Sequence, residues 1–223
     1  MTTLTCNDLY KEVKNWSDMI NTNIDFMNGK IDRTFYHGGP LDDETLDKRN
    51  KGLFLNQCIE LNKLQLFTYC SQPYRYYEDE EDETICDYHQ KSYVYFLCEP
   101  HIGPKLYKEL LKDERVFISY ENYTLKTMTD NFDTDLYVVT RQRITPNRII
   151  FYEKYKKIEV DGYYHHSHWY RDYLNTSNRM ECHVKKFPIM HEMLSNCCNI
   201  VVVCKNDESA PEIVLDIMKK IIL

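Results

Sequence analysis

The sequence predicts an α/β domain, with α+β as the alternative, in which helices pack on a single mixed sheet. Three observations predict this. Apolar residues from Leu9 to Met27 recur every three or four positions, which indicates a long amphipathic N-terminal helix. The run Ile200–Cys204 is apolar at every position, as expected for an interior strand covered on both faces. Residues 209–221 again show apolar side chains at helical spacing, which predicts an amphipathic C-terminal helix.

The elements between these ends follow from shorter patterns. A helix is expected to begin at Asp42 or Asp43. Two further helices are expected to begin at Pro104 and at Pro188, and Ser209 with Glu212 resembles the capping box of the C-terminal helix. Apolar or alternating runs predict strands at 66–70, 93–98, 116–119, 136–139, 149–152 and 181–187, and a helix is expected around 169–174. We interpret residues 1–223 as one domain with an acidic, aromatic loop or flap at about 74–91.

Charge and composition narrow the function classes. The net charge of −7 argues against broad binding to nucleic-acid backbone, which needs a basic face. No segment approaches the ~20 apolar residues that span a bilayer, and the first residues lack the pattern of a signal peptide. The nine cysteines are therefore expected to be reduced, in a cytoplasmic protein. Abundant Phe, Tyr, Met, Ile, Asn and Lys beside a single alanine favour an AT-rich large DNA virus or eukaryote, with host cytoplasm or virion as the viral location.

Residues 8–73 carry a family resemblance. The chain has Gly39-Pro40-Leu-Asp-Asp-Glu-Thr45, then Leu61-Asn62 and Phe67-Thr68, and then Ser71-Gln72-Pro73. This order and spacing resemble an uncharacterised domain family, common in actinobacteria, with the pattern Gly-Pro-x-Asp-Glu-Glu-Thr, Leu-Asn-x-x-Gly-Phe-x-Thr and Ser-Gln-Pro-Gly. The resemblance implies a fold and a site location but no activity. Here Leu66 and Tyr74 stand where the family has glycines, and their side chains limit how closely a ligand could approach the backbone.

The first candidate site joins two loops. Ser-Gln-Pro is predicted to lie just past the carboxyl end of a strand, where open α/β sheets place ligands, and Gly-Gly-Pro leads into a helix N-terminus. The alternative is that these residues only form a tight turn and helix caps. The candidate ligand-binding residues are Gly38, Gly39, Asp42, Asp43, Thr45, Ser71 and Gln72.

Two further clusters are weighed against ordinary packing. Cys86 with His89, and Cys98 with His101, have the residue types and two-residue spacing of a zinc site, although Cys98 falls inside a predicted strand. The second cluster consists of His165, His166 and His168. It could bind metal or shuttle protons, but the aromatic residues on either side of it favour an aromatic surface or a packing layer.

Two functions follow from these patterns, and the sequence decides neither of them nor whether the protein is an enzyme. The first is binding of a small-molecule or nucleotide-like ligand at the Gly-Gly-Pro/Ser-Gln-Pro junction. The second is a non-enzymatic protein-interaction or virion accessory role, for which the tyrosine-rich acidic segment at 74–91 would supply the partner surface. A concave site where the two loops meet would favour the first function, and a flat aromatic surface would favour the second.

Overall fold

The computed structural model describes residues 6–32, 34, 52–77, 87–122, 127–130, 139–142, 164–166 and 187–222. The helices are α1 (Cys6–Glu12), α2 (Trp16–Met27), α3 (Leu53–Lys63), α4 (Gly103–Leu110), α6 (Pro188–Ser195) and α7 (Ala210–Ile222). The strands are β1 (Phe67–Gln72), β2 (Arg75–Tyr77), β3 (Asp87–Gln90), β4 (Tyr93–Cys98), β5 (Val116–Asn122), β6 (Thr127–Asp130), β7 (Val139–Gln142), β8 (Tyr164–His166) and β9 (Cys198–Cys204).

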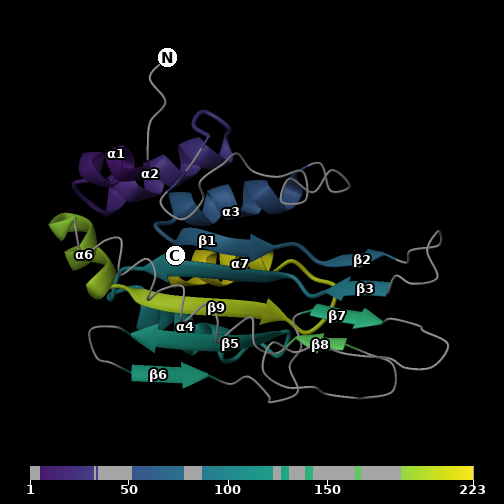
Figure 1. Cartoon of the computed structure of the whole chain (residues 1–223). Coiled ribbons are helices and arrows are strands. Elements are labelled where there is room, and N and C mark those ends of the chain that lie inside the picture. The colour runs from purple at the N-terminus through teal and green to yellow at the C-terminus, as the bar shows by residue number, and fades with distance from the viewer. Residues whose placement is uncertain are drawn as a thin grey trace.

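The main sheet has five strands in the order β1-β4-β9-β5-β6. Figure 1 shows α4 and α7 behind this sheet, α1 to α3 along its β1 edge, and α6 at one end. The predicted fold class, a sheet with helices packed on it, is confirmed. Two details of the prediction differ, because a second sheet of order β2-β3-β7-β8 is present and every described strand pairing is antiparallel.

The two sheets are joined by one long hairpin. Gln72 pairs with Tyr93 in the main sheet, and Arg75 pairs with Gln90 in the second sheet, so the register of β1 with β4 continues unchanged into β2 with β3. Residues 75–77 and 87–90, which the sequence placed in a loop or flap, therefore form strands. The acidic run between them lies outside the described residues.

The apolar core fills the side of the sheet that α4 and α7 cover. β9 is buried at every position, as its uninterrupted apolar run predicted. Side chains from β4, β5 and β9 meet α4 and α7 in one cluster, which includes Phe96, Leu106, Ile118, Val202 and Val214. Burial of about 25 cal/mol per Å² of apolar surface makes this cluster the main stabilising layer.

The predicted N-terminal helix is interrupted. α1 ends at Glu12 and α2 begins at Trp16, with Asn15 as its N-cap. The Asn15 side chain accepts a hydrogen bond from the backbone N–H of Asp18 (2.9 Å), and the Asp18 carboxylate accepts one from the backbone N–H of Lys14 (2.9 Å). This reciprocal capping starts a new helix within one continuous apolar stripe, which periodicity alone does not reveal.

Three other predicted helices are confirmed, and several predicted elements lie outside the described residues. The helices opened by Pro104 and Pro188 are confirmed as α4 and α6. α7 is also confirmed, but Ser209 and Glu212 do not cap each other, because both hydrogen-bond to Gln57 of α3, at 2.5 and 3.3 Å. The strands expected at 149–152 and 181–186 and the helix at 169–174 lie outside the described residues. No helix in the described part of the chain is long and apolar enough to cross a membrane.

A buried amide network attaches α2 and α3 to β1. The Asn23 side chain donates to the Asn62 side chain (2.9 Å) and to the backbone carbonyl of Thr68 (2.6 Å). The Asn62 amide in turn donates to the carbonyl of Cys58 (2.8 Å) and to the hydroxyl of Thr68 (2.6 Å). Since Asn23, Asn62 and Thr68 are almost fully buried, each lost bond would leave a polar group without solvent.

We predict that Asn62→Ala lowers the free energy of unfolding by about 2–4 kcal/mol, because it leaves the buried polar groups of Asn23 and Thr68 without their hydrogen bonds to Asn62. The matched control is Asn28→Ala, which removes an exposed asparagine that donates only to the Ile24 carbonyl. The control should cost about 0.5 kcal/mol or less. Urea unfolding of the two variants and the parent measures both values, and equal losses would contradict the role assigned to the network.

Candidate functional site

Ser71 and Gln72 lie inside β1, not past its end. Ser71 pairs with Val94 and Gln72 with Tyr93, so the predicted turn begins only at Pro73. The Ser71 hydroxyl is buried and has no oxygen or nitrogen hydrogen-bond partner among the described residues. It lies beside Cys58 of α3, where burial raises the pKa of the thiol to about 12 and the hydroxyl offsets part of that rise.

The other half of this candidate site lies outside the described residues. It comprises Gly38, Gly39, Asp42, Asp43 and Thr45. The convergence of the two loops therefore stays a prediction.

Only part of the predicted zinc site lies among the described residues, so zinc binding stays a prediction, and the positions that the structure describes are far apart. His89 lies in β3 and Cys98 is the last residue of β4, with a nearly continuous extended chain between them. At about 3.3 Å per residue, nine residues place the two positions on the order of 30 Å apart. Cys98 is buried and His101 is exposed, and no group of three potential metal ligands occurs among the described residues. Cys86 lies outside them.

The histidine cluster is only partly described. His165 and His166 belong to β8 at the edge of the second sheet, where they pair with Thr140 and Val139. His168 lies outside the described residues.

Beyond Ser71, the strand register assembles a row of four side chains across one end of the main sheet. Tyr74 follows β1, Lys91 precedes β4, Lys205 follows β9 and Arg115 precedes β5. Extending the registers of the three strand pairs sets these residues directly opposite one another. A backbone hydrogen bond from the Lys205 N–H to the Arg115 carbonyl (2.8 Å) supports the alignment. We call these four residues the terminal row.

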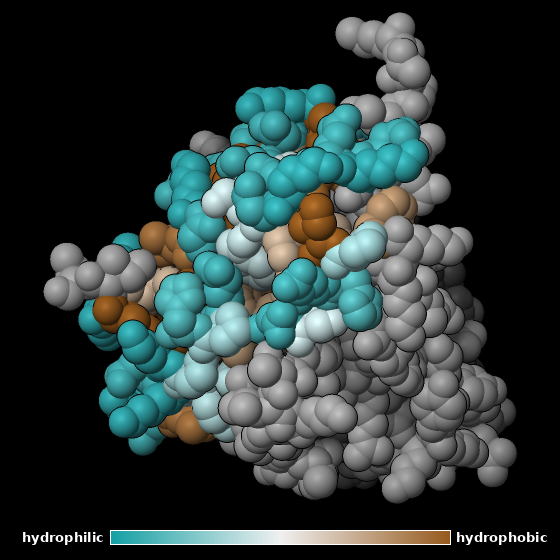
Figure 2. All heavy atoms as spheres, turned by 90° about the vertical axis from the view of Figure 1, so that its left-hand side faces the viewer, coloured by the Kyte–Doolittle hydropathy of each residue, from teal (hydrophilic) through white to brown (hydrophobic). Residues whose placement is uncertain are grey.

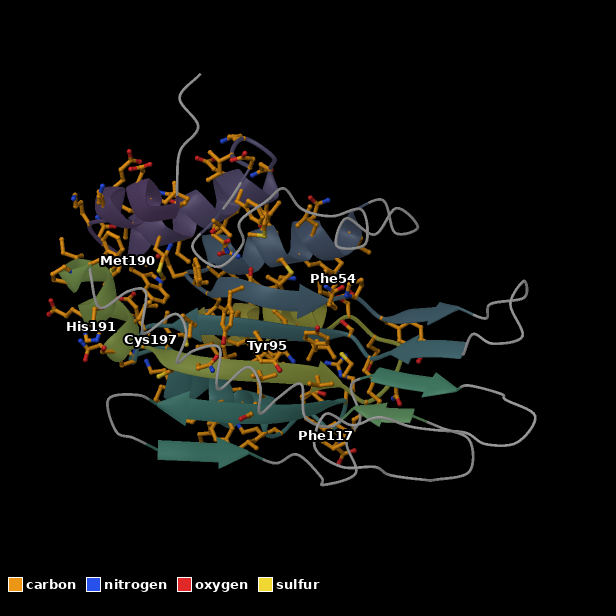
Figure 3. All side chains as sticks on the ribbon, in the orientation of Figure 1. Phe54, Tyr95, Phe117, Met190, His191 and Cys197 are labelled. Atoms are coloured by element: carbon orange, nitrogen blue, oxygen red, sulfur yellow. The ribbon has the colours of Figure 1, made fainter. Side chains whose placement is uncertain are left out.

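Two ammonium groups of the terminal row converge on Phe117. The Lys205 Nζ atom lies 4.7 Å from the centre of the Phe117 ring, and the Lys91 Nζ atom lies 5.8 Å from it. Figure 3 shows Phe117 at the opposite end of the sheet from Cys197. Neither lysine forms an ion pair with a carboxylate in the described part of the chain. Burial, and to a smaller degree the charge of Lys205, lower the pKa of half-buried Lys91.

The third cation of the row is already neutralised. Arg115 donates to both carboxylate oxygens of Asp113, at 2.9 and 2.7 Å, and to Glu208 at 3.4 Å. These hydrogen bonds hold the pKa of Asp113 below its usual value. The uncompensated positive charge of the row therefore belongs to Lys91 and Lys205 alone.

Tyr74 closes the row on the β1 side. Burial, together with the charge of Asp207 and a hydrogen bond to it, raises the pKa of the Tyr74 hydroxyl. The phenol therefore stays protonated at neutral pH, and it donates a hydrogen bond to the Asp207 carboxylate. The two ammonium groups of Lys91 and Lys205 are the donors of the row that suit an anion.

A cavity of about 360 Å³ occupies the other end of the sheet. It lies between the α1–α2 turn, the residues after β4, and α6, and its wall includes Trp16, Glu99 and Glu192. Figure 2 shows this side of the molecule, where apolar residues form small separate areas among hydrophilic ones. The Lys14 ammonium of the wall is already bound to the Lys11 carbonyl at 2.7 Å, so the two carboxylates have no free cation of the described wall beside them.

The terminal row was not predicted from the sequence. Its members lie at positions 74, 91, 115 and 205, each just outside a strand, and only the strand pairing brings them together. No family model matches the chain, and a search of curated proteins gives no match. The family resemblance of residues 8–73 therefore stays a prediction from the motif.

We predict that Lys91→Met raises the free energy of unfolding in anion-free buffer. Like charges opposite each other on neighbouring strands cost about 0.2–1 kcal/mol, and the substitution removes one of them. Because the pKa of Lys91 is lowered on folding, the unfolded chain binds more protons between that pKa and the unfolded value of ~10.4, so stability rises with pH across this window. Lys91→Met should remove that rise.

Chemical denaturation across the alkaline range measures this effect, with Lys63→Met as the control. Lys63 is exposed and pairs with Glu60 at 2.6 Å, so its removal should leave the pH profile unchanged. A lower stability of Lys91→Met at neutral pH would show that the ammonium has a compensating partner.

We further predict that Ser71→Ala changes the free energy of unfolding by less than about 0.5 kcal/mol, because its buried hydroxyl has no oxygen or nitrogen partner among the described residues and only the weakly bonding Cys58 thiol beside it. Thr68→Val, on the same strand, is the control and should cost about 1–3 kcal/mol, because it takes an acceptor from the Asn62 amide. Thermal unfolding of both variants makes the comparison. A cost for Ser71→Ala equal to that of Thr68→Val would assign Ser71 a structural bond.

Proposed function

We propose that the protein binds a small anionic ligand, such as a nucleotide-like molecule, at the terminal row. The observation that carries this proposal is the convergence of Lys91 and Lys205 on Phe117 without a carboxylate partner among the described residues. Two like charges held together raise the energy of the ligand-free protein, and a bound phosphate or carboxylate would relieve that cost. The chain as a whole carries a net charge of −7, so this positive site is local.

Three features support the location. The row lies where β1 and β9 end and α7 begins, next to Ser71 and Gln72 of the sequence-based candidate. Tyr74 lies beside Lys91 and binds the nearby Asp207 carboxylate through its hydroxyl, and the Phe117 ring gives the site an apolar wall. Binding requires no further chemistry from the chain, and we propose no reaction.

The alternative is a protein-interaction role. It depends on the acidic and aromatic segment between β2 and β3, and the part of that segment from 78 to 86 lies outside the described residues. In the described part of the chain, the exposed large apolar side chains are Leu53, Leu111 and Ile189, one on α3, one just after α4 and one on α6. Single exposed apolar residues do not mark an interface, so the described surface does not favour this role.

A thermal-shift comparison tests the proposal. We expect inorganic phosphate and nucleoside phosphates to stabilise the parent protein, and the unphosphorylated nucleoside to do so far less, at constant ionic strength. At a hundred times its dissociation constant a ligand adds about 2.7 kcal/mol, which corresponds to several degrees in a protein of this size. The double variant Lys91→Met/Lys205→Met should lose this stabilisation.

The matched control is Lys63→Met/Lys112→Met. It removes the same two charges from exposed lysines that pair with Glu60 and Glu109, so the net charge changes equally. Equal stabilisation of both double variants by phosphate would move the site away from the terminal row. A broad ligand set that stabilises none of the proteins would favour the interaction role.

A further inference from the structure

A second constellation lies at the opposite end of β9, where Cys198 pairs directly with Cys98 of β4. Both thiols are buried under the first residue of α4, Gly103. A Cβ atom at position 103 would lie 2.6 Å from the Cys198 Sγ atom and 3.4 Å from the Cys98 Sγ atom. The glycine thus allows the helix to approach both sulfur atoms, and the two thiols share one small space.

The surroundings of Cys198 favour its thiolate. The Tyr120 hydroxyl lies 3.5 Å from the Cys198 Sγ atom, and the Tyr120 ring stacks on Tyr107 at 4.8 Å between ring centres. The first turn of α4, the positive end of that helix, lies against the same sulfur atom. A hydrogen bond with Cys98 lowers the pKa of Cys198 and raises that of Cys98, although burial opposes ionisation of both thiols.

Cys204, at the other end of β9, can be compared with Cys198. It is as fully buried as Cys198. Both belong to the same core cluster. Burial raises the pKa of Cys204 to about 12, and no paired thiol lies across from it, because its β5 neighbour is Val116. The contrast between the two cysteines of β9 therefore comes from what surrounds them, not from exposure.

We propose that Cys98 and Cys198 form an oxidisable dithiol, in which Cys198 is the nucleophile toward hydrogen peroxide and Cys98 the resolving thiol. The Cys198 thiolate attacks one peroxide oxygen, the O–O bond breaks, and hydroxide leaves and takes up a proton to form water. Cys98 then attacks the sulfenic acid on Cys198, an S–S bond forms, and a second water leaves. In total, two thiols lose two electrons and two protons, and one peroxide is reduced to two waters.

The backbone geometry accommodates the product. Residues directly opposite each other in an antiparallel pair have Cα atoms about 4.5–5.5 Å apart, which lies inside the range of disulfides. The bond would link β4 to β9 at the end of the sheet that carries Glu99 and Cys197. It would not involve the terminal row, so this inference is independent of the proposed ligand site.

The experiment treats the folded, reduced protein with hydrogen peroxide, alkylates the remaining thiols at intervals, and maps the peptides by mass spectrometry. We expect loss of two hydrogens from the intact protein, a linked pair of peptides containing Cys98 and Cys198, and alkylation of Cys204 at its original level. The thiols of Cys198 should disappear at least about tenfold faster than those of Cys204.

Two variants keep the inference falsifiable. In Cys98→Ser the reaction should stop at a Cys198 sulfenic acid that dimedone traps. Tyr120→Phe keeps the ring stacked on Tyr107 but removes the hydroxyl, and should slow oxidation of Cys198 while leaving Cys204 unaffected. Oxidation of Cys198 and Cys204 at one common rate would show that both react only through unfolding and would overturn the inference. So would a disulfide mapped to Cys197 and Cys198, or an unchanged rate in Tyr120→Phe.

Discussion

The structure depends on the complete burial of β9 between two neighbours. All seven residues of this strand are buried, and it pairs along its length with β4 on one side and β5 on the other. Because side chains alternate between faces, a slip of one residue would turn Val202 and Ile200 out of the core that α4 and α7 form. The apolar pattern therefore fixes the register of β9. That register determines the neighbours at each end of the strand, so that Lys205 lies beside Lys91 and Arg115, and Cys198 lies opposite the Cys98 thiol.

The elements that the sequence predicts well are those with one strong local pattern. The run Ile200–Cys204 and the stripe of α7 are apolar at a clear period, and Pro104 and Pro188 mark two helix starts. The break at Asn15 escaped prediction because capping interrupts the backbone while the apolar stripe continues. The terminal row escaped because each of its residues is unremarkable in its own segment, and their proximity is a property of strand pairing.

The described residues of the motif in 8–73 have structural roles in this chain. Leu61 and Asn62 lie in the last turn of α3, and the Thr68 hydroxyl accepts a hydrogen bond from the Asn62 amide, which fixes the corner between α3 and β1. The residue at this corner with a positive φ is Gln65, at 67°, whereas Leu66 is a fully buried core residue. A left-handed residue at a helix end favours glycine for backbone reasons alone. The left-handed turn after α3 therefore falls at Gln65, one residue before the position compared with the glycine of the motif, and Ser71 is a strand residue.

The pairing of β9 also shapes how the chain must fold during its synthesis. Val203 pairs with Tyr93 on one side and with Phe117 on the other. Both partners precede it by roughly a hundred residues. Until the ribosome has made β9, β4 and β5 each lack the neighbour that lies between them, and the unpaired backbone N–H and C=O groups along those edges are open to wrong pairing. Such long-range closure is slow, so the sheet stays incomplete until β9 has been translated.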